Sequence, residues 1–279
     1  MFLPISFLKK IGKITTCEMD LLLYALERSD QFYCPGIKVT EVVEKTGMNK
    51  QSFYNCIKSL AKKHIIYYPE NNRPHQDYDI TIFCDRLETP EARSEGYVNL
   101  SRKIYQDKKF KNLSGKAKWL VFYFSYFCSK KGSNKRKIKD FYGEICELLG
   151  IKRRQLFNLL QEIKEIVKIS QKKRKTYKFE LQEKALFKSN SYNATDKVRE
   201  YIVSCWLRRS QSTFESEEEK LKLIEETMKF YLQYANKAIQ AKTNIYNVMR
   251  RAFEKYTKYK KKTPFDIKYL HVLIQGELA

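Results

Sequence analysis

The feature that most constrains the fold is an internal repeat. The segment GMNKQSFYNCIKSLAKKHII, which begins at Gly47, aligns without gaps on GIKRRQLFNLLQEIKEIVKI, which begins at Gly150. In each copy apolar residues recur at i, i+3, i+4 and i+7, the pattern of a helix with one buried face. These residues are Phe53, Cys56, Ile57 and Leu60 in one copy and Leu156, Leu159, Leu160 and Ile163 in the other. The chain is therefore expected to contain two copies of one supersecondary unit.

The flanks of the two copies match as well. A short helix with a buried Val42/Val43 or Ile145/Cys146 pair precedes each glycine, which predicts helix, tight turn and helix. A further apolar helix precedes each unit, and the first begins at a capping box of Thr15 and Glu18. Alternating apolar residues predict a hairpin after each unit, over residues 65–68 and 78–82, and over 166–169 and 177–181. This order resembles the winged-helix superfamily, in which the hairpins are wings.

The remainder of the chain has a helical pattern. Helices are predicted over residues 195–209, 216–241, 244–262 and 265–275, and Ser216 with Glu219 forms a second capping box. The residues SNSYNAT (189–195) read as the linker. The expected fold is mainly α with small β-wings. It comprises a first winged-helix domain over 1–95, a second over 96–188, and an all-helical C-terminal interaction domain over 189–279.

Charge is the unusual part of the composition. The chain has 55 Lys and Arg against 32 Asp and Glu, a formal net charge of +23. So large an excess repels itself in a compact fold, which favours a polyanionic partner, nucleic acid first and an acidic membrane second. The longest apolar run, WLVFYFSYFC, is much shorter than the roughly 20 residues of a spanning helix, so no membrane partner is expected. A cytoplasmic location, on the nucleoid or a plasmid, follows.

The repeated helices carry polar groups suited to DNA. An α-helix fits the major groove, where Arg and Lys recognise guanine and Asn and Gln recognise adenine. The predicted contacts on the first helix are Asn49, Lys50, Gln51, Tyr54, Asn55 and Lys58, and on the second Lys152, Arg153, Arg154, Asn158 and Gln161. Phosphate contacts are predicted from the wings and a loop over 129–137, at Arg73, Lys135, Arg136, Lys172, Lys173, Arg174 and Lys175.

The positive charge is concentrated on the second unit. Residues 130–175 hold 15 Lys and Arg against five Asp and Glu, an excess of ten. A charge that only improved solubility would be spread evenly along the chain. Two other interpretations stay open, because winged helices also serve as protein-interaction modules and lysine-rich surfaces are often simply solvated.

Signatures of catalysis are absent from the sequence. No G-x-x-x-x-G-K-[ST] phosphate loop occurs, and the three histidines are isolated from one another. His75, Asp77 and Asp79 alternate along one strand, which fits a solvent-facing polar edge better than a metal site. The seven scattered cysteines fit core positions better than zinc or disulfide roles. We predict no enzyme activity, cofactor or metal.

One segment carries a family resemblance. The stretch GYVNLSRKIYQDKKFKNLSGKAKWLVFYF resembles the opening of winged-helix replication initiators from plasmids and phages of low-GC Gram-positive bacteria, and the match centres on LSGKA, residues 113–117. The resemblance implies binding to repeated sites in origin DNA and recruitment of the primosome. The helical tail resembles the partner-binding tails of DnaD-like proteins, although residues 244–259 match their motif only in part. It implies contact with primosome or helicase-loader proteins.

The sequence therefore predicts a sequence-specific protein that binds double-stranded DNA and initiates replication of a plasmid or other mobile element. Two recognition helices on one chain would enter major grooves about 34 Å, one helical turn, apart. The alternative is a transcription regulator or partition-type adaptor of the same architecture. A third reading is an RNA-binding or structural protein. Homodimerisation is left open by the sequence.

Overall fold

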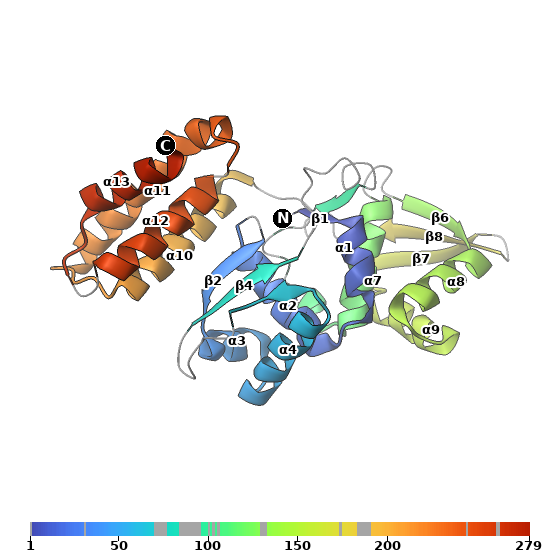
Figure 1. The fold of residues 1–279 in the computed structure, drawn as a ribbon. Coiled ribbons are helices and arrows are strands. Elements are labelled where there is room, and N and C mark those ends of the chain that lie inside the picture. The colour runs from blue at the N-terminus through green and yellow to red at the C-terminus, as the bar shows by residue number, and fades with distance from the viewer. Residues whose placement is uncertain are drawn as a thin grey trace. The chain divides into compact units, whose positions relative to one another are not determined.

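The computed structural model describes residues 2–30, 32–69, 77–83, 96–99, 101, 104, 107–128, 133–172, 175–182, 191–243, 245–260 and 263–279. The fold is mainly helical, with small antiparallel sheets (Figure 1). Among the described helices, none combines the length and the apolar character that crossing a bilayer requires.

The chain divides into two compact units. The first contains Met1–Glu27, Ile37–Gln76 and Ile80–Asn190, and the second contains Arg28–Gly36, Asp77–Asp79 and Ser191–Ala279. The predicted division at residues 95 and 188 stays a prediction.

The sequence repeat corresponds to a repeat of topology. The first repeat, residues 16–82, consists of α2 (Thr16–Arg28), β2 (Tyr33–Ile37), α3 (Val39–Thr46), α4 (Lys50–Lys62), β3 (Ile66–Tyr67) and β4 (Tyr78–Ile82). The second repeat, residues 115–181, consists of α7 (Gly115–Cys128), β6 (Ser133–Lys137), α8 (Ile138–Leu149), α9 (Arg153–Glu162), β7 (Val167–Lys172) and β8 (Thr176–Leu181). The last strand lies in the middle of each sheet, in the orders β2-β4-β3 and β6-β8-β7. The helices and hairpin strands predicted for both repeats are confirmed.

The first strand of each sheet is a correction to the sequence analysis. Residues 133–137 were expected in a loop, but they form β6 and pair with β8, with Asn134 opposite Phe179 and Arg136 opposite Tyr177. The sequence SNKRK has no apolar alternation, so its strand conformation comes from backbone hydrogen bonds to β8. β2, with the sequence YCPGI, contains the strand-breaking residues proline and glycine and was missed for that reason.

Buried stripes and glycine turns shape the two helix pairs. Phe53 and Leu60 in α4, and Leu156 and Leu160 in α9, are buried as their spacing predicts. Gly47 ends α3 and Gly150 ends α8, both in the left-handed conformation that glycine adopts without steric cost. The second helix of each pair therefore begins within three residues of the glycine, as the aligned sequences require.

The predicted capping box at the start of α2 is confirmed. Glu18 N–H donates to Thr15 Oγ1 at 3.3 Å, and Thr15 N–H donates to Glu18 Oε2 at 2.6 Å. The same carboxylate accepts from Lys63 Nζ at 2.6 Å, which joins the end of α4 to the start of α2. Burial by itself would raise the pKa of Glu18, but hydrogen bonds from Lys63 and Ser59 hold it below its usual value.

The first helices of the two repeats are joined by buried polar contacts. Lys118, whose side chain is 1% exposed, bonds Asp20 Oδ1 at 2.6 Å. Gly115 N–H donates to Thr16 Oγ1 at 3.0 Å, and a Cβ at Gly115 would lie 2.8 Å from Thr16 Cα, so no larger residue fits without a shift. Trp119 of α7 donates to the Leu8 carbonyl at 2.6 Å, which ties in the N-terminal segment. This segment contains β1 (Phe2–Pro4), α1 (Ile5–Lys10) and the 3-10 helix η1 (Ile11–Lys13), and β1 pairs with β5 (Tyr97–Asn99).

The second unit contains the four predicted tail helices. They are α10 (Ser191–Ser210), α11 (Glu217–Gln240), α12 (Ile245–Tyr259) and α13 (Ile267–Leu278), and Trp206 stacks on Phe253 in their core with ring centroids 4.6 Å apart. Two details differ from the prediction. Residues 191–195 were expected in the linker, but their backbone is helical and forms the first turns of α10. Ser216 caps α11 through Glu219 N–H, but the Glu219 side chain returns to Glu215 N–H instead of Ser216 N–H.

The buried pair between α2 and α7 generates a stability prediction. Asp20→Ala removes the carboxylate that faces a buried ammonium group, so we expect the free energy of unfolding to fall by about 3–5 kcal/mol in urea denaturation. Asp20→Ala/Lys118→Met should recover most of that loss, because both charges are then gone. Glu217→Ala, which breaks a surface pair with Lys220, is the control and should change stability by less than about 1 kcal/mol. Equal losses in all three variants would contradict this account.

Candidate nucleic-acid interface

The second helices of the two repeats present the same pattern on their outer side. This outward face comprises Lys50, Gln51, Tyr54, Asn55 and Lys58 on α4 and Arg153, Arg154, Phe157, Asn158 and Gln161 on α9. The two sets coincide position by position when the repeats are aligned at Gly47 and Gly150. Of the ten side chains, nine are exposed and Tyr54 is half-buried. The outward face is therefore accessible on both helices, opposite the buried stripes that hold them.

Local hydrogen bonds fix the beginning of each helix. The Asn49 side chain caps α4 by accepting from Ser52 N–H at 2.7 Å. At α9 the Gln155 side chain accepts from Lys152 N–H at 2.9 Å. Asn49 and Lys152, both predicted DNA contacts, are exposed residues at the N-caps. A helix N-terminus carries partial positive charge and unpaired N–H groups, which suit a phosphate.

The two copies of the outward face differ in chemistry. On α4 the amide of Gln51 donates to Asn55 Oδ1 at 3.0 Å, so these two side chains form an organised amide pair between Lys50 and Lys58. On α9 the corresponding residues begin with two arginines, Arg153 and Arg154, and no ion pair to either is found in the part of the chain that the structure describes. Each face carries two basic side chains, but on α9 both are arginines at adjacent positions, with guanidinium groups available to an external anion.

Phe157 is a member of the face that the sequence analysis missed. Its side chain is 51% exposed, in the position that Tyr54 occupies in the first repeat. The sequence signal was its alignment with Tyr54, which was predicted as a contact, but Phe157 was included neither in the predicted core nor among the predicted contacts. An exposed aromatic ring between Arg153, Arg154 and Asn158 can contact the C5-methyl group of thymine.

The hairpin of the second repeat adds further positive charge. Lys168 on β7 and Lys175 at the turn are exposed, and Lys135 is exposed on β6. Lys178 forms an ion pair with Glu180 on the same strand. Of the other predicted wing contacts, Arg73, Lys173 and Arg174 lie outside the described residues, and only the backbone of Lys172 is described.

Arg136 has an internal role. Its Nη2 bonds Glu144 Oε2 at 2.5 Å, Nη1 donates to the Tyr123 hydroxyl, and the guanidinium lies 5.4 Å from the centroid of the Phe127 ring. Burial by itself would lower the pKa of Arg136, but its hydrogen bonds with Glu144 and Tyr123 raise it above the usual value. Because these contacts use the guanidinium, we leave Arg136 out of the proposed interface.

The LSGKA segment at residues 113–117 is a packing junction. Ser114 bonds the Glu162 carboxylate at the end of α9 through N–H and Oγ, the latter at 2.9 Å. Lys116 Nζ donates to the Leu149 carbonyl at the end of α8 at 3.0 Å, and burial lowers the pKa of Lys116. With Gly115 held against Thr16, these residues fix the ends of both helices of the second pair relative to α7. They support the outward face without belonging to it.

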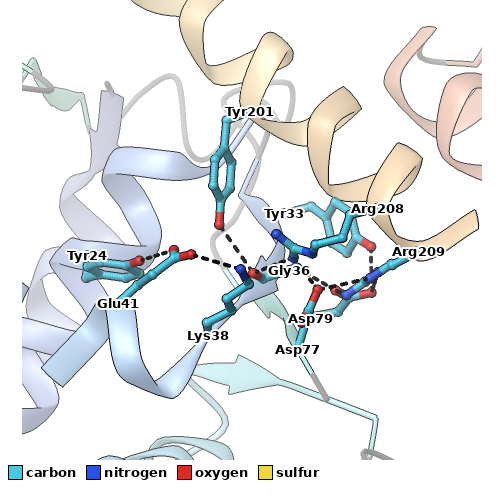
Figure 2. Close-up of polar contacts among 10 residues, drawn as sticks. All are labelled: Tyr24, Tyr33, Gly36, Lys38, Glu41, Asp77, Asp79, Tyr201, Arg208 and Arg209. Atoms are coloured by element: carbon cyan, nitrogen blue, oxygen red, sulfur yellow. Dashed lines mark hydrogen bonds and ion pairs between the residues drawn. The ribbon is translucent and has the colours of Figure 1, made fainter. Parts of the chain in front are cut away.

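An ion-pair cluster in the second unit was not predicted (Figure 2). The Asp79 carboxylate accepts from Arg209 through both oxygens, at 2.9 and 2.5 Å, and from the Tyr33 hydroxyl at 2.9 Å. Asp77 pairs with Arg208, and its carboxylate lies 3.6 Å from Arg209 Nε. Burial, with the charge of Asp79, raises the pKa of Tyr33 well above its usual value, so its hydroxyl stays protonated as a donor.

The cluster corrects the interpretation of the HxDxD strand segment. Asp77 and Asp79 face arginines of α10, so a solvent-facing edge does not describe them, while His75 lies outside the described residues. In the described ranges no three His, Cys, Asp or Glu side chains are grouped as metal ligands. Four of the described cysteines, Cys34, Cys56, Cys128 and Cys205, are buried and form no disulfide, but Cys17 is exposed, contrary to a core role.

Comparison with protein-family models gives no match to this chain, and a search of curated proteins gives none either.

The cluster generates a prediction about the second unit. Asp79→Asn keeps the side-chain shape but removes the charge that binds Arg209, so we expect the free energy of unfolding to fall by about 2 kcal/mol. This loss is smaller than for a fully buried ion pair, because both side chains are partly exposed. Amide hydrogen exchange should show faster opening of α10. Asp196→Asn is the control. Asp196 lies on α10, with its Oδ1 3.9 Å from Arg199 Nη1, and its replacement should have little effect on stability. An equal response of the two variants would argue against the cluster as a stabilising centre.

Proposed function

We propose that this protein binds double-stranded DNA with sequence specificity, using the second helix of each repeat for recognition. The observation that carries the proposal is the outward face. Two helices in one chain expose basic, amide and aromatic side chains at the same five positions, while their opposite sides are buried. A helix presenting such groups from its N-terminal half is the element that enters the major groove in helix-turn-helix proteins.

The topology supports a winged-helix assignment for both repeats. Each runs helix, strand, helix, helix, strand, strand, and the last strand lies in the middle of its sheet. The hairpin β7–β8 would be the wing of the second repeat, with Lys168 and Lys175 next to the phosphate backbone. The wing and the helix N-terminus would position the protein, and the outward face would read the bases.

The roles on α9 follow from side-chain chemistry. Arg153 and Arg154 suit the O6 and N7 acceptors of guanine, and Asn158 suits the N6 and N7 edge of adenine. Phe157 suits a thymine methyl group. On α4 the Gln51–Asn55 pair and the flanking lysines would form a second recognition surface, with lysines in place of arginines. With a formal net charge of +23, binding is expected to weaken steeply as salt rises.

Base preference tests the recognition role. Arg154→Ala should relax the preference at one position of the selected DNA site, at a cost of about 1–3 kcal/mol for the preferred base. The measurement is fluorescence anisotropy with a selected duplex and its single-base variants at fixed salt. Arg251→Ala on α12 removes the same charge away from the outward face and should leave base preference unchanged. If Arg154→Ala weakened every duplex by the same factor, Arg154 would be a phosphate contact and not a reader.

Within this function we propose replication initiation at a plasmid or mobile-element origin. The support is the resemblance of residues 96–124 to initiators, together with a separate helical unit that offers a surface for primosome or helicase-loader proteins. A regulator or partition adaptor with the same DNA-binding repeats would lack that recruitment.

An origin assay separates these roles. A DNA circle that carries the binding repeats but no other origin should replicate in a low-GC Gram-positive host only when this protein is supplied. Arg154→Ala should reduce its copy number, because origin binding comes first. Site-specific DNA binding without replication, combined with capture of RNA polymerase instead of primosome proteins, would favour the regulator.

A further inference from the structure

Helix α11 exposes a row of large apolar side chains. Leu221, Leu232 and Ile239 are 53%, 75% and 71% exposed, respectively. Single exposed apolar residues are ordinary, but a contiguous row on a folded protein marks an interaction surface. These three residues are spaced 11 and seven apart, which brings them to the same side of an α-helix.

The row follows the spacing of a coiled-coil seam. Steps of four and three residues connect Leu221, Glu225, Met228, Leu232, Ala235 and Ile239, and this set is called the α11 seam. None of the six is buried. The core of the second unit uses a different side of α11, at Ile224, Thr227, Tyr231, Tyr234 and Ala238. Met228 also packs partly against this core, but the other seam residues are additional to the packing that holds α11 in its own bundle.

The seam has twofold symmetry about residue 230. Reversing the helix about that point brings Leu221 to Ile239 and Met228 to Leu232, and it brings Glu225 to the small Ala235. The layers then alternate as in an antiparallel helix pair, in which each a position meets a d position of the partner helix.

Charges at the ends favour the same arrangement. Glu218 continues the seam at its N-terminal end, and Lys242, whose backbone is left-handed just past the C-cap, lies beyond its C-terminal end. Both side chains are exposed, and no ion pair to either is found within the described ranges. Antiparallel pairing of two copies would bring Glu218 of one to Lys242 of the other, twice in each dimer. A parallel pair would instead bring Glu218 to Glu218 and Lys242 to Lys242.

We propose that two copies of this chain dimerise through antiparallel pairing of the α11 seam. The self-complementary order of apolar layers and terminal charges identifies a second copy as the occupant. The surface belongs to the second unit and is separate from the outward face, so the dimer does not depend on DNA binding. The dimer would bring two DNA-binding units into one complex, so that two DNA sites can be bound together.

Sedimentation equilibrium of the full chain over a concentration series tests the dimer. The wild-type protein should show a monomer–dimer equilibrium, and Leu232→Glu should raise the dissociation constant on the order of 100-fold, because each dimer loses two buried leucines. Val272→Glu, at a 60%-exposed position on α13, is the matched control and should dimerise as the wild type does. Circular dichroism should show both variants folded. A monomer throughout the series, or equal loss in both variants, would overturn the proposal.

Charge reversal tests the antiparallel orientation. Glu218→Lys should weaken the dimer by facing a lysine with Lys242 of the partner, and Glu218→Lys/Lys242→Glu should restore it. In a parallel dimer the double variant would restore nothing, because like charges would still face each other. We expect the wild-type protein and the double variant to dimerise to the same extent, and the single variant to dimerise more weakly. Failure of DNA binding in the earlier assay would leave this result unchanged.

Discussion

The buried contact between α2 and α7 is the interaction on which the arrangement of the first unit depends. Lys118 and Asp20 form an ion pair that is almost closed to water, and Gly115 lies against Thr16 one turn earlier. A buried charge is tolerated only with its counter-ion, so this contact favours one register of the two helices. Because α7 also carries the LSGKA junction, the same contact fixes the ends of α8 and α9.

Basic side chains in this protein have two different roles. Arg136, Arg208 and Arg209 pair with carboxylates of their own units, Arg136 also lies over the Phe127 ring, and Lys118 is buried. Arg153 and Arg154 instead project from α9. A net charge alone cannot distinguish these groups, whereas burial and pairing can. The excess that remains exposed on the second repeat is the part available to a polyanion.

The DNA-binding and dimerisation proposals use surfaces on different units. One surface is polar and basic, as contact with phosphates and base edges requires. The other is mainly apolar, with one glutamate within the seam and opposite charges at its two ends, as in a helix–helix interface. This separation lets affinity for a DNA site and affinity between copies vary independently, and a dimer would combine them when two DNA sites are bound together.

Much of the fold was determined by the sequence itself. The spacing of apolar residues located both helix pairs, the hairpin strands and the four tail helices, because a periodic buried face is a local property of the chain. It also located the outward face, since positions opposite a buried stripe must point away from the core. What the sequence could not show was pairing between distant residues. β2 and β6 lack strand periodicity and exist because of their partners, and Phe157 is exposed although it is apolar. Arg209 meets Asp79 across 130 positions of the chain, and Arg136 meets Glu144 instead of solvent. Local pattern fixes which side of an element is buried, but only tertiary contacts decide which charged groups are neutralised within the protein and which remain for a partner.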